Sequence, residues 1–218
     1  MIISIGALGG SGTRAIAEVF IQAGVFMGDD LNESNDNLVF SRLFKNPEWY
    51  RTASPEEKNK RLRVFHSFMQ EGALTRDEFM ALSRAASDNA IVPSSYSFYF
   101  RILKTLVRKR QHRTVWGWKE PNTQIYLKEI LHFSPRIKYI HVLRHGLDMA
   151  LSRNRQQLRN WGWKYGIHLT GEESDEKLTV KQLDYWIQST RDVTAQSEGF
   201  EDRFHMLNHT EFCMGFEI

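Results

Sequence analysis

Short apolar runs alternate with helical patterns along the chain, and this alternation predicts a parallel α/β fold. Segments with apolar residues at helical spacing separate the runs, which favours a parallel β-sheet flanked by helices. At 218 residues the chain is long enough for one sizeable domain, so we expect residues 1–218 to form a single domain. The five expected strands are Ile2–Ile5, Val25–Met27, Thr114–Trp118, Lys138–Leu143 and Arg203–Leu207.

Capping sequences mark where several helices begin and end. The first helix ends at Gly24, where its apolar pattern stops. Capping boxes begin at Ser54, which is followed by proline at the first helical position, and at Thr75. The last long helix is expected to begin at Thr179 and to end at Gly199.

The stretch at about residues 33–112 reads as a helical insertion between the second and third expected strands. Its last helix is expected to begin at Ser95. Four large apolar residues follow at helical spacing: Tyr96, Tyr99, Leu103 and Leu106. An insertion at this point in a sheet often shapes the part of a site that receives a second substrate.

The glycine-rich segment GALGGSGTR, residues 6–14, connects the first expected strand to the first expected helix. Glycines let backbone N–H groups converge on a phosphate, and the helix N-terminus adds positive potential. A nucleotide triphosphatase needs Lys and then Ser or Thr at the end of this loop. Here Gly12 is followed by Thr13 and Arg14, so the segment predicts phosphate binding without the usual magnesium chemistry.

An arginine follows the fourth expected strand, where a magnesium-dependent nucleotidase often has an aspartate. Ligands bind at the carboxyl ends of strands in such sheets, so Arg144 is aimed at the ligand crevice. A guanidinium there suits a phosphate, and Ser152 can add a hydroxyl donor from the following helix. The loop and Arg144 with Ser152 therefore predict two phosphate-binding positions.

Three motifs in this order resemble the sulfotransferases that use 3′-phosphoadenosine 5′-phosphosulfate as donor. They are SGT at residues 11–13, Lys119 in WGWKEPNT, and RHGLDMALS at residues 144–152, and they span residues 1–152. The resemblance implies a phosphate-loop fold, a nucleotide donor and a sulfuryl transfer that needs no metal ion. It also implies which residues bind the donor: Gly10, Ser11, Gly12, Thr13 and Arg14 at the 5′-phosphosulfate, and Arg144 and Ser152 at the 3′-phosphate.

The resemblance also implies the catalytic residues. Many relatives carry a cation just before Ser-Gly-Thr, where this chain has Gly10, so we expect Arg14 and Lys119 together to supply the positive charge. Relatives that act on sugars or peptides use a carboxylate after the second strand, which selects Asp29 or Asp30 as the base. Glu120 is the competing candidate. The acceptor is expected to be a hydroxyl or amine of a small molecule or carbohydrate.

Two other functions compete with this interpretation: a non-catalytic nucleotide-binding relative, and a small-molecule kinase of the phosphate-loop class. Magnesium-dependent ATP binding would favour the kinase. The net charge of +3 is compatible with an anionic ligand and too small to indicate nucleic acid. The single cysteine, Cys213, excludes an intramolecular disulfide and a cysteine-built zinc site. Without a signal sequence or a run long enough to span a membrane, we expect a cytoplasmic protein with no membrane partner.

Overall fold

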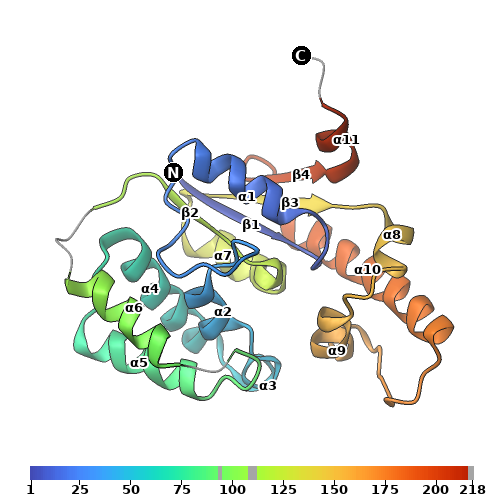
Figure 1. The fold of residues 1–218 in the computed structure, drawn as a ribbon, viewed down its shortest axis with the longest axis horizontal. Coiled ribbons are helices and arrows are strands. Elements are labelled where there is room, and N and C mark those ends of the chain that lie inside the picture. Colours follow the sequence, from blue (N-terminus) through green and yellow to red (C-terminus); the bar gives the residue numbers. More distant parts are fainter. Residues whose placement is uncertain (93–94, 108–111, 216–218) are drawn as a thin grey trace.

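The structure is a computed structural model that describes residues 1–92, 95–107 and 112–215. Within those residues, one parallel sheet has its strands in the order β2-β1-β3-β4 (Figure 1). The strands are β1 (Ile2–Ala7), β2 (Trp116–Lys119), β3 (Ile137–Leu143) and β4 (Phe204–Asn208). The predicted α/β fold with a parallel sheet flanked by helices is confirmed.

The register brings the carboxyl ends of the four strands to one edge of the sheet. Ile5 of β1 is level with Lys119 of β2, and Leu143 of β3 is level with Asn208 of β4. All six residues of β1 are buried, so this strand lies at the centre of the sheet. The loops after β1, β2 and β3 consequently meet at one edge, where ligands bind in folds of this kind.

The strand predicted at Val25–Met27 is wrong. Only Phe26 makes a parallel bridge there, to Trp116 of β2. Gly24 and Gly28 flank the segment with φ angles of 82° and 125°, in the left-handed region that favours glycine. The extended segment is therefore too short to continue the ladder beyond one bridge.

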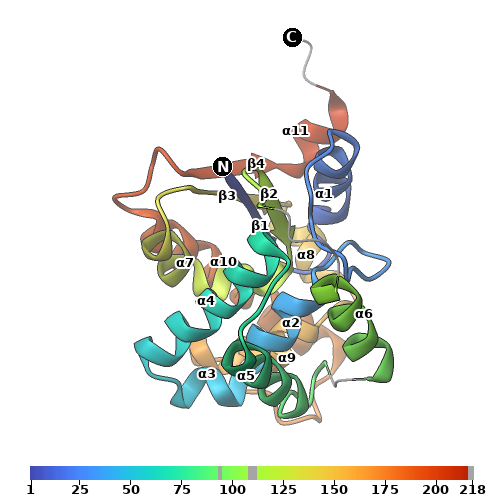
Figure 2. The ribbon, with the colours of Figure 1, turned by 90° about the vertical axis from the view of Figure 1, so that its left-hand side faces the viewer.

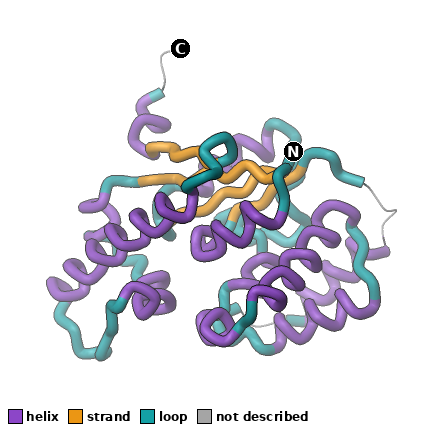
Figure 3. The backbone as a smooth tube through the Cα atoms, turned by 180° about the vertical axis from the view of Figure 1, so that it is seen from behind, coloured by secondary structure: helices purple, strands orange, loops and turns teal. Residues whose placement is uncertain are grey.

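Helices cover both faces of the sheet (Figures 1 and 3). α1 (Thr13–Gln22) packs with Ile3 and Ile5 on one face, and Phe212 of α11 (His209–Met214) contacts the same cluster. On the other face, α7 (Leu127–Phe133) and α10 (Asp175–Ser197) pack against Tyr139. The shorter helices are η1 (Pro121–Tyr126, 3₁₀), α8 (Gly146–Ala150), α9 (Gln156–Trp161) and η2 (Gly162–Tyr165, 3₁₀).

Among the described residues between α1 and β2 there are five helices, in the region of the expected insertion (Figure 2). They are α2 (Leu38–Phe44), α3 (Pro47–Thr52), α4 (Pro55–Glu71), α5 (Arg76–Ser87) and α6 (Tyr96–Val107). Both capping boxes form as expected, because the Ser54 and Thr75 hydroxyls accept from the third helical N–H while the glutamate there reaches back.

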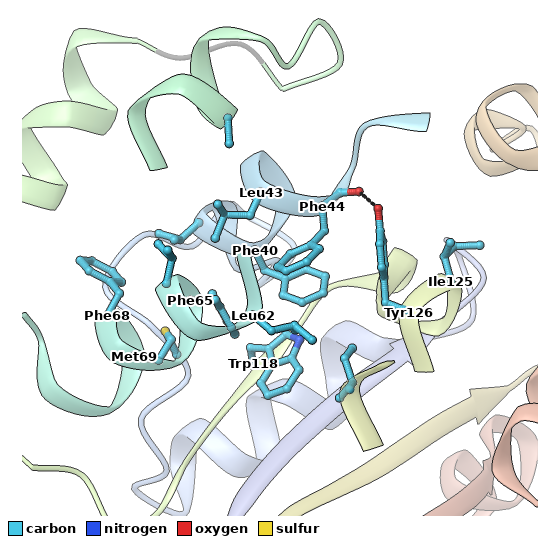
Figure 4. Packing of buried hydrophobic residues seen from close by; sticks show 14 of the residues in the cluster. Phe40, Leu43, Phe44, Leu62, Phe65, Phe68, Met69, Trp118, Ile125 and Tyr126 are labelled. Carbon is cyan, nitrogen blue, oxygen red and sulfur yellow. Dashed lines mark hydrogen bonds between the residues drawn. The ribbon is translucent and has the colours of Figure 1, made fainter. Parts of the chain in front are cut away.

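The insertion shares one hydrophobic core with the edge of the sheet (Figure 4). Phe40 stacks on Phe44 with ring centroids 4.5 Å apart and on Trp118 of β2 at 5.7 Å. Phe65 of α4 meets Trp118 edge-on at 5.2 Å. The Tyr126 hydroxyl donates to the Phe44 carbonyl at 2.6 Å. These contacts fix α2 and α4 beside β2, and they place the loop before α2 next to Lys119.

Two helix predictions need correction. α10 begins at Asp175, because the Ser174 hydroxyl caps it and two acidic residues in its first turn suit the helix dipole. Thr179 is thus an interior residue of α10 rather than its cap. α6 begins after Ser95 as expected, but the structure leaves Tyr96 and Leu103 exposed and buries Phe98 instead.

Candidate active site

The glycine-rich loop runs from the end of β1 to the first turn of α1. Gly10 and Gly12 have φ angles of 98° and 87°, so both positions need glycine. In the described structure no side chain caps α1, and its first turn holds no acidic residue. Its N-terminal potential is therefore not neutralised from within the helix and faces the loop, which is the arrangement that binds anions.

Residues distant in the sequence hold the loop in shape. The Gly9 amide donates to Oε1 of Gln157 at 2.8 Å, and Nε2 of Gln157 donates to the Ala7 carbonyl at 3.2 Å. Arg144 Nη1 donates to the Gly10 carbonyl at 3.1 Å. Ser152 Oγ lies 3.8 Å from where a Cβ would stand on Gly10. The structure therefore brings Arg144 and Ser152 to the loop.

A cavity of about 340 Å³ opens between the loop and the carboxyl end of β2. Arg14, Lys119 and Glu120 all line it, together with the loop glycines and Thr13. Ser34, Asp36, Lys45, Asn122, Asn154, Gln156 and Gln157 complete most of its wall. The two cations and one carboxylate that the sequence selected therefore lie around one space.

Lys119 is buried and held from the loop before α2. Its ammonium donates to Oδ1 of Asp36 at 2.5 Å and to the Ser34 carbonyl at 3.0 Å. Asp36 is a cavity carboxylate that the sequence reasoning missed. It lies six positions after Asp30, and nothing in the local sequence distinguishes it from a loop aspartate.

Glu120 is buried at the start of η1. Both of its oxygens accept from Asn122, one from the backbone N–H at 2.6 Å and one from the side-chain amide at 2.8 Å. Burial raises the pKa of Glu120 above its ordinary value, against a smaller opposing effect of Lys45. This carboxyl group lines the cavity but is fixed by its neighbour.

Asp29 and Asp30 do not line this cavity. Asp30 is buried between two guanidinium groups, with Oδ2 3.1 Å from Arg42 and Oδ1 2.8 Å from Arg101. Burial raises its pKa, while both arginines lower it. Asp29 accepts from the Thr105 hydroxyl at 3.0 Å. Both carboxylates thus attach α6 to the segment between α1 and α2. Their role as base stays a prediction that the geometry does not favour.

A second cavity, of about 350 Å³, lies beside Arg144 between the ends of β3 and β4. Leu143, Leu147, Leu183 and Trp186 give it apolar walls, and Asn208 and Thr210 are among the polar residues. The indole N–H of Trp186 donates to the Arg144 carbonyl at 3.2 Å. An aromatic, mostly apolar space therefore adjoins a guanidinium that also contacts the loop.

His209, at the start of α11, lies directly against the loop, a contact that the sequence reasoning missed. Its ring would stand only 2.0 Å from a Cβ built on Gly12. Cys213, one turn later, is exposed, with Sγ 3.5 Å from Nε2 of His209. Position 12 therefore needs glycine for two reasons: its backbone is left-handed, and the imidazole of His209 occupies the space that a Cβ would fill.

Neither a metal-binding cluster nor a membrane-spanning helix is found among residues 1–92, 95–107 and 112–215. No three His, Cys, Asp or Glu side chains there gather closely enough to hold a metal ion. Nor does any helix in those ranges combine the length and the apolar character needed to cross a bilayer.

The fold and the site define a parallel α/β protein whose glycine-rich loop lies at the ligand-binding edge of its sheet. The sulfotransferase family model matches residues 8–214, so the chain belongs to the sulfotransferase family, whose members are transferases. No curated protein matches it. Among solved structures it is similar to a sulfotransferase domain from the curacin biosynthetic pathway, with 16% identity and a TM-score of 0.43. That match covers 96% of this chain and 66% of the other.

Proposed function

We propose that this protein transfers a sulfuryl group from 3′-phosphoadenosine 5′-phosphosulfate to a hydroxyl or amine of a polar acceptor, without a metal ion. One observation carries the proposal. The uncapped N-terminus of α1, Arg14 and the buried Lys119 converge on one cavity at the edge of the sheet. Such a cavity offers positive charge from protein groups alone, which is what sulfuryl transfer without a metal requires.

The donor is expected to bind along the loop. Backbone N–H groups at Ser11–Thr13 would hold the 5′-phosphosulfate, and Arg144 with Ser152 would hold the 3′-phosphate. The apolar cavity beside Arg144 suits the adenine, because Trp186 offers it an aromatic surface. This assignment distinguishes a 3′-phosphorylated nucleotide from ATP, which has no group for Arg144 in this position.

Charge moves from sulfur toward the leaving phosphate oxygen as the acceptor oxygen or nitrogen bonds to sulfur. The ammonium of Lys119 has three N–H donors, of which Asp36 and Ser34 use two, so one stays available for the sulfuryl oxygens. Arg14 would stabilise the same developing negative charge from the loop side of the cavity. The products are 3′,5′-diphosphoadenosine and the sulfated acceptor.

Asp36 is the carboxylate best placed to take the acceptor's proton. It lines the cavity and is partly exposed, whereas both oxygens of Glu120 are occupied by Asn122. The wall beside it carries Ser34, Lys45 and Gln156, so the acceptor we expect is polar and hydroxylated, as a carbohydrate is. Glu120 remains the alternative base.

The test combines binding with turnover. Calorimetry without magnesium should show 3′,5′-diphosphoadenosine binding more tightly than AMP, and ATP with magnesium should bind no better than AMP. Release of 3′,5′-diphosphoadenosine from the donor is then followed with a panel of sugar and amine acceptors. Tight binding without any turnover would favour the non-catalytic relative. Preference for magnesium-ATP would favour the kinase and overturn the proposal.

A further inference from the structure

The helix α6 carries a stripe of large apolar side chains that faces solvent. Tyr96, Phe100, Leu103 and Val107 are 97%, 68%, 50% and 84% exposed. They lie at positions 1, 5, 8 and 12 of the helix, which fall within about 60° of one another at 100° per residue. Single exposed apolar residues are ordinary on a surface, but four on one stripe indicate an interaction surface.

The opposite side of α6 is firmly attached, so the stripe does not result from a loose helix. Phe98 and Ile102 are buried in the core of the insertion. Arg101 pairs with the buried Asp30 at 2.8 Å, and the Thr105 hydroxyl donates to Asp29 at 3.0 Å. The protein therefore holds α6 in one orientation and presents the stripe outward.

The charge of α6 is of one sign. Its twelve residues, all described, include Arg101 and Lys104 and no acidic residue. At 100° per residue, Lys104 lies about 70° from the centre of the stripe, whereas Arg101 lies about 130° away, toward the attached side, and is paired with Asp30. Lys104 beside exposed Tyr, Phe and Leu side chains, with no acidic residue on the helix, matches helices that rest in the headgroup region of an anionic bilayer.

We propose that the outer face of α6 docks on an anionic lipid surface, with the apolar stripe entering the headgroup region and Lys104 meeting lipid phosphates. A second copy of the chain fits this face poorly, since two acid-free basic helices would place like charges together. The expectation of no membrane partner rests on the absence of a run long enough to span a membrane. A helix that lies in the headgroup region needs no such run. The proposal does not depend on the sulfotransferase reaction.

Docking there would also orient the candidate active site. α6 is bonded to Asp29 and Asp30, and the loop that follows them carries Ser34 and Asp36 in the cavity wall. Docking of α6 would therefore fix the position of this loop relative to the lipid surface.

Vesicle co-sedimentation of the full chain tests the proposal. The probes are vesicles of phosphatidylcholine with phosphatidylglycerol and vesicles of phosphatidylcholine alone. We expect clear binding to the anionic vesicles, weaker binding to the neutral ones, and loss with rising salt. The double variant Phe100→Ser/Leu103→Ser should weaken binding by roughly tenfold or more, because it removes two apolar side chains whose transfer from water into the headgroup region favours binding.

The matched control is Val19→Ser/Val180→Ser, which removes two exposed apolar side chains from α1 and α10 and should bind like the wild type. Lys104→Glu should weaken binding, whereas Lys177→Glu on α10 should not. Thermal unfolding checks each variant.

If the double variant Phe100→Ser/Leu103→Ser unfolds early, Tyr96→Ser, at the most exposed position of the stripe, replaces it. Absent vesicle binding, or binding unchanged in the α6 variants, overturns the proposal, as does a dimer in light scattering that Phe100→Ser/Leu103→Ser abolishes.

Discussion

Replacing Arg144 with alanine should remove most of the preference for a 3′-phosphorylated nucleotide. A guanidinium has five N–H donors, and here one goes to the Gly10 carbonyl and one to Asp148, which leaves three for a phosphate. A charge-assisted hydrogen bond contributes about 1.5–3 kcal/mol. Because the side chain is 39% exposed, the lower end applies, which is about a tenfold loss of affinity.

The assay is calorimetry of 3′,5′-diphosphoadenosine and of AMP without magnesium. Arg144 also supports the loop through Gly10, so its loss weakens both nucleotides somewhat, and the ratio of the two affinities isolates the 3′-phosphate. Asp148→Ala is the matched control, since it removes the local partner of Arg144 and keeps the guanidinium. If the ratio is the same in wild type and Arg144→Ala, the 3′-phosphate does not bind at this arginine and the reasoning is wrong.

Three further substitutions test the site. Lys119→Ala should lower turnover while 3′,5′-diphosphoadenosine affinity, measured by calorimetry, stays nearly unchanged, because its contact strengthens only as charge moves; an equal loss in both would contradict this. Asp36→Asn should lower kcat by roughly 10²–10⁴-fold, and the reverse ranking with Glu120→Gln in the same assay would make Glu120 the base. Gly12→Ala should lower the thermal midpoint and nucleotide affinity together, since φ is 87° and the new methyl group meets His209; wild-type values in both would refute it.

Most of the sheet could be predicted from the sequence because β1 and β2 are short runs whose residues are all buried and β3 is a largely apolar run. β1 and β3 are the clearest cases, and both lie at the centre of the sheet. The errors have local causes. Val25–Met27 is as apolar as a strand, but its flanking glycines turn the chain away, and apolar content carries no signal of those φ angles. The apolar spacing predicts the helix α6, yet a helix with apolar residues on two sides gives no sign of which side is buried.

Some residues of the candidate site could be predicted from the sequence and others could not. Residues fixed by their position at a strand end, such as Lys119 and Arg144, could be found from the sequence because strand ends in a parallel sheet share one edge. Asp36, Gln157 and His209 could not, because each reaches the site from a loop or helix end whose path depends on packing elsewhere. The resemblance selects Asp30 as a candidate base, and that role stays a prediction; no local pattern indicates that Arg42 and Arg101 hold this carboxylate in the interior.

One hydrogen-bonded unit connects the loop to the floor of the cavity. Gln157 accepts from the Gly9 amide and donates to Oδ1 of Asn122, and Asn122 in turn donates twice to Glu120. Gln157, Asn122 and Glu120 are buried and each has its position fixed by the next, so Glu120 behaves as part of the frame that shapes the loop. A general base must form a new hydrogen bond to each acceptor that binds. Glu120 could do so only by giving up a hydrogen bond to Asn122, which would disturb the frame. Asp36 lines the same cavity, is bonded to Lys119 rather than to the frame, and is therefore the carboxylate that we propose as the base.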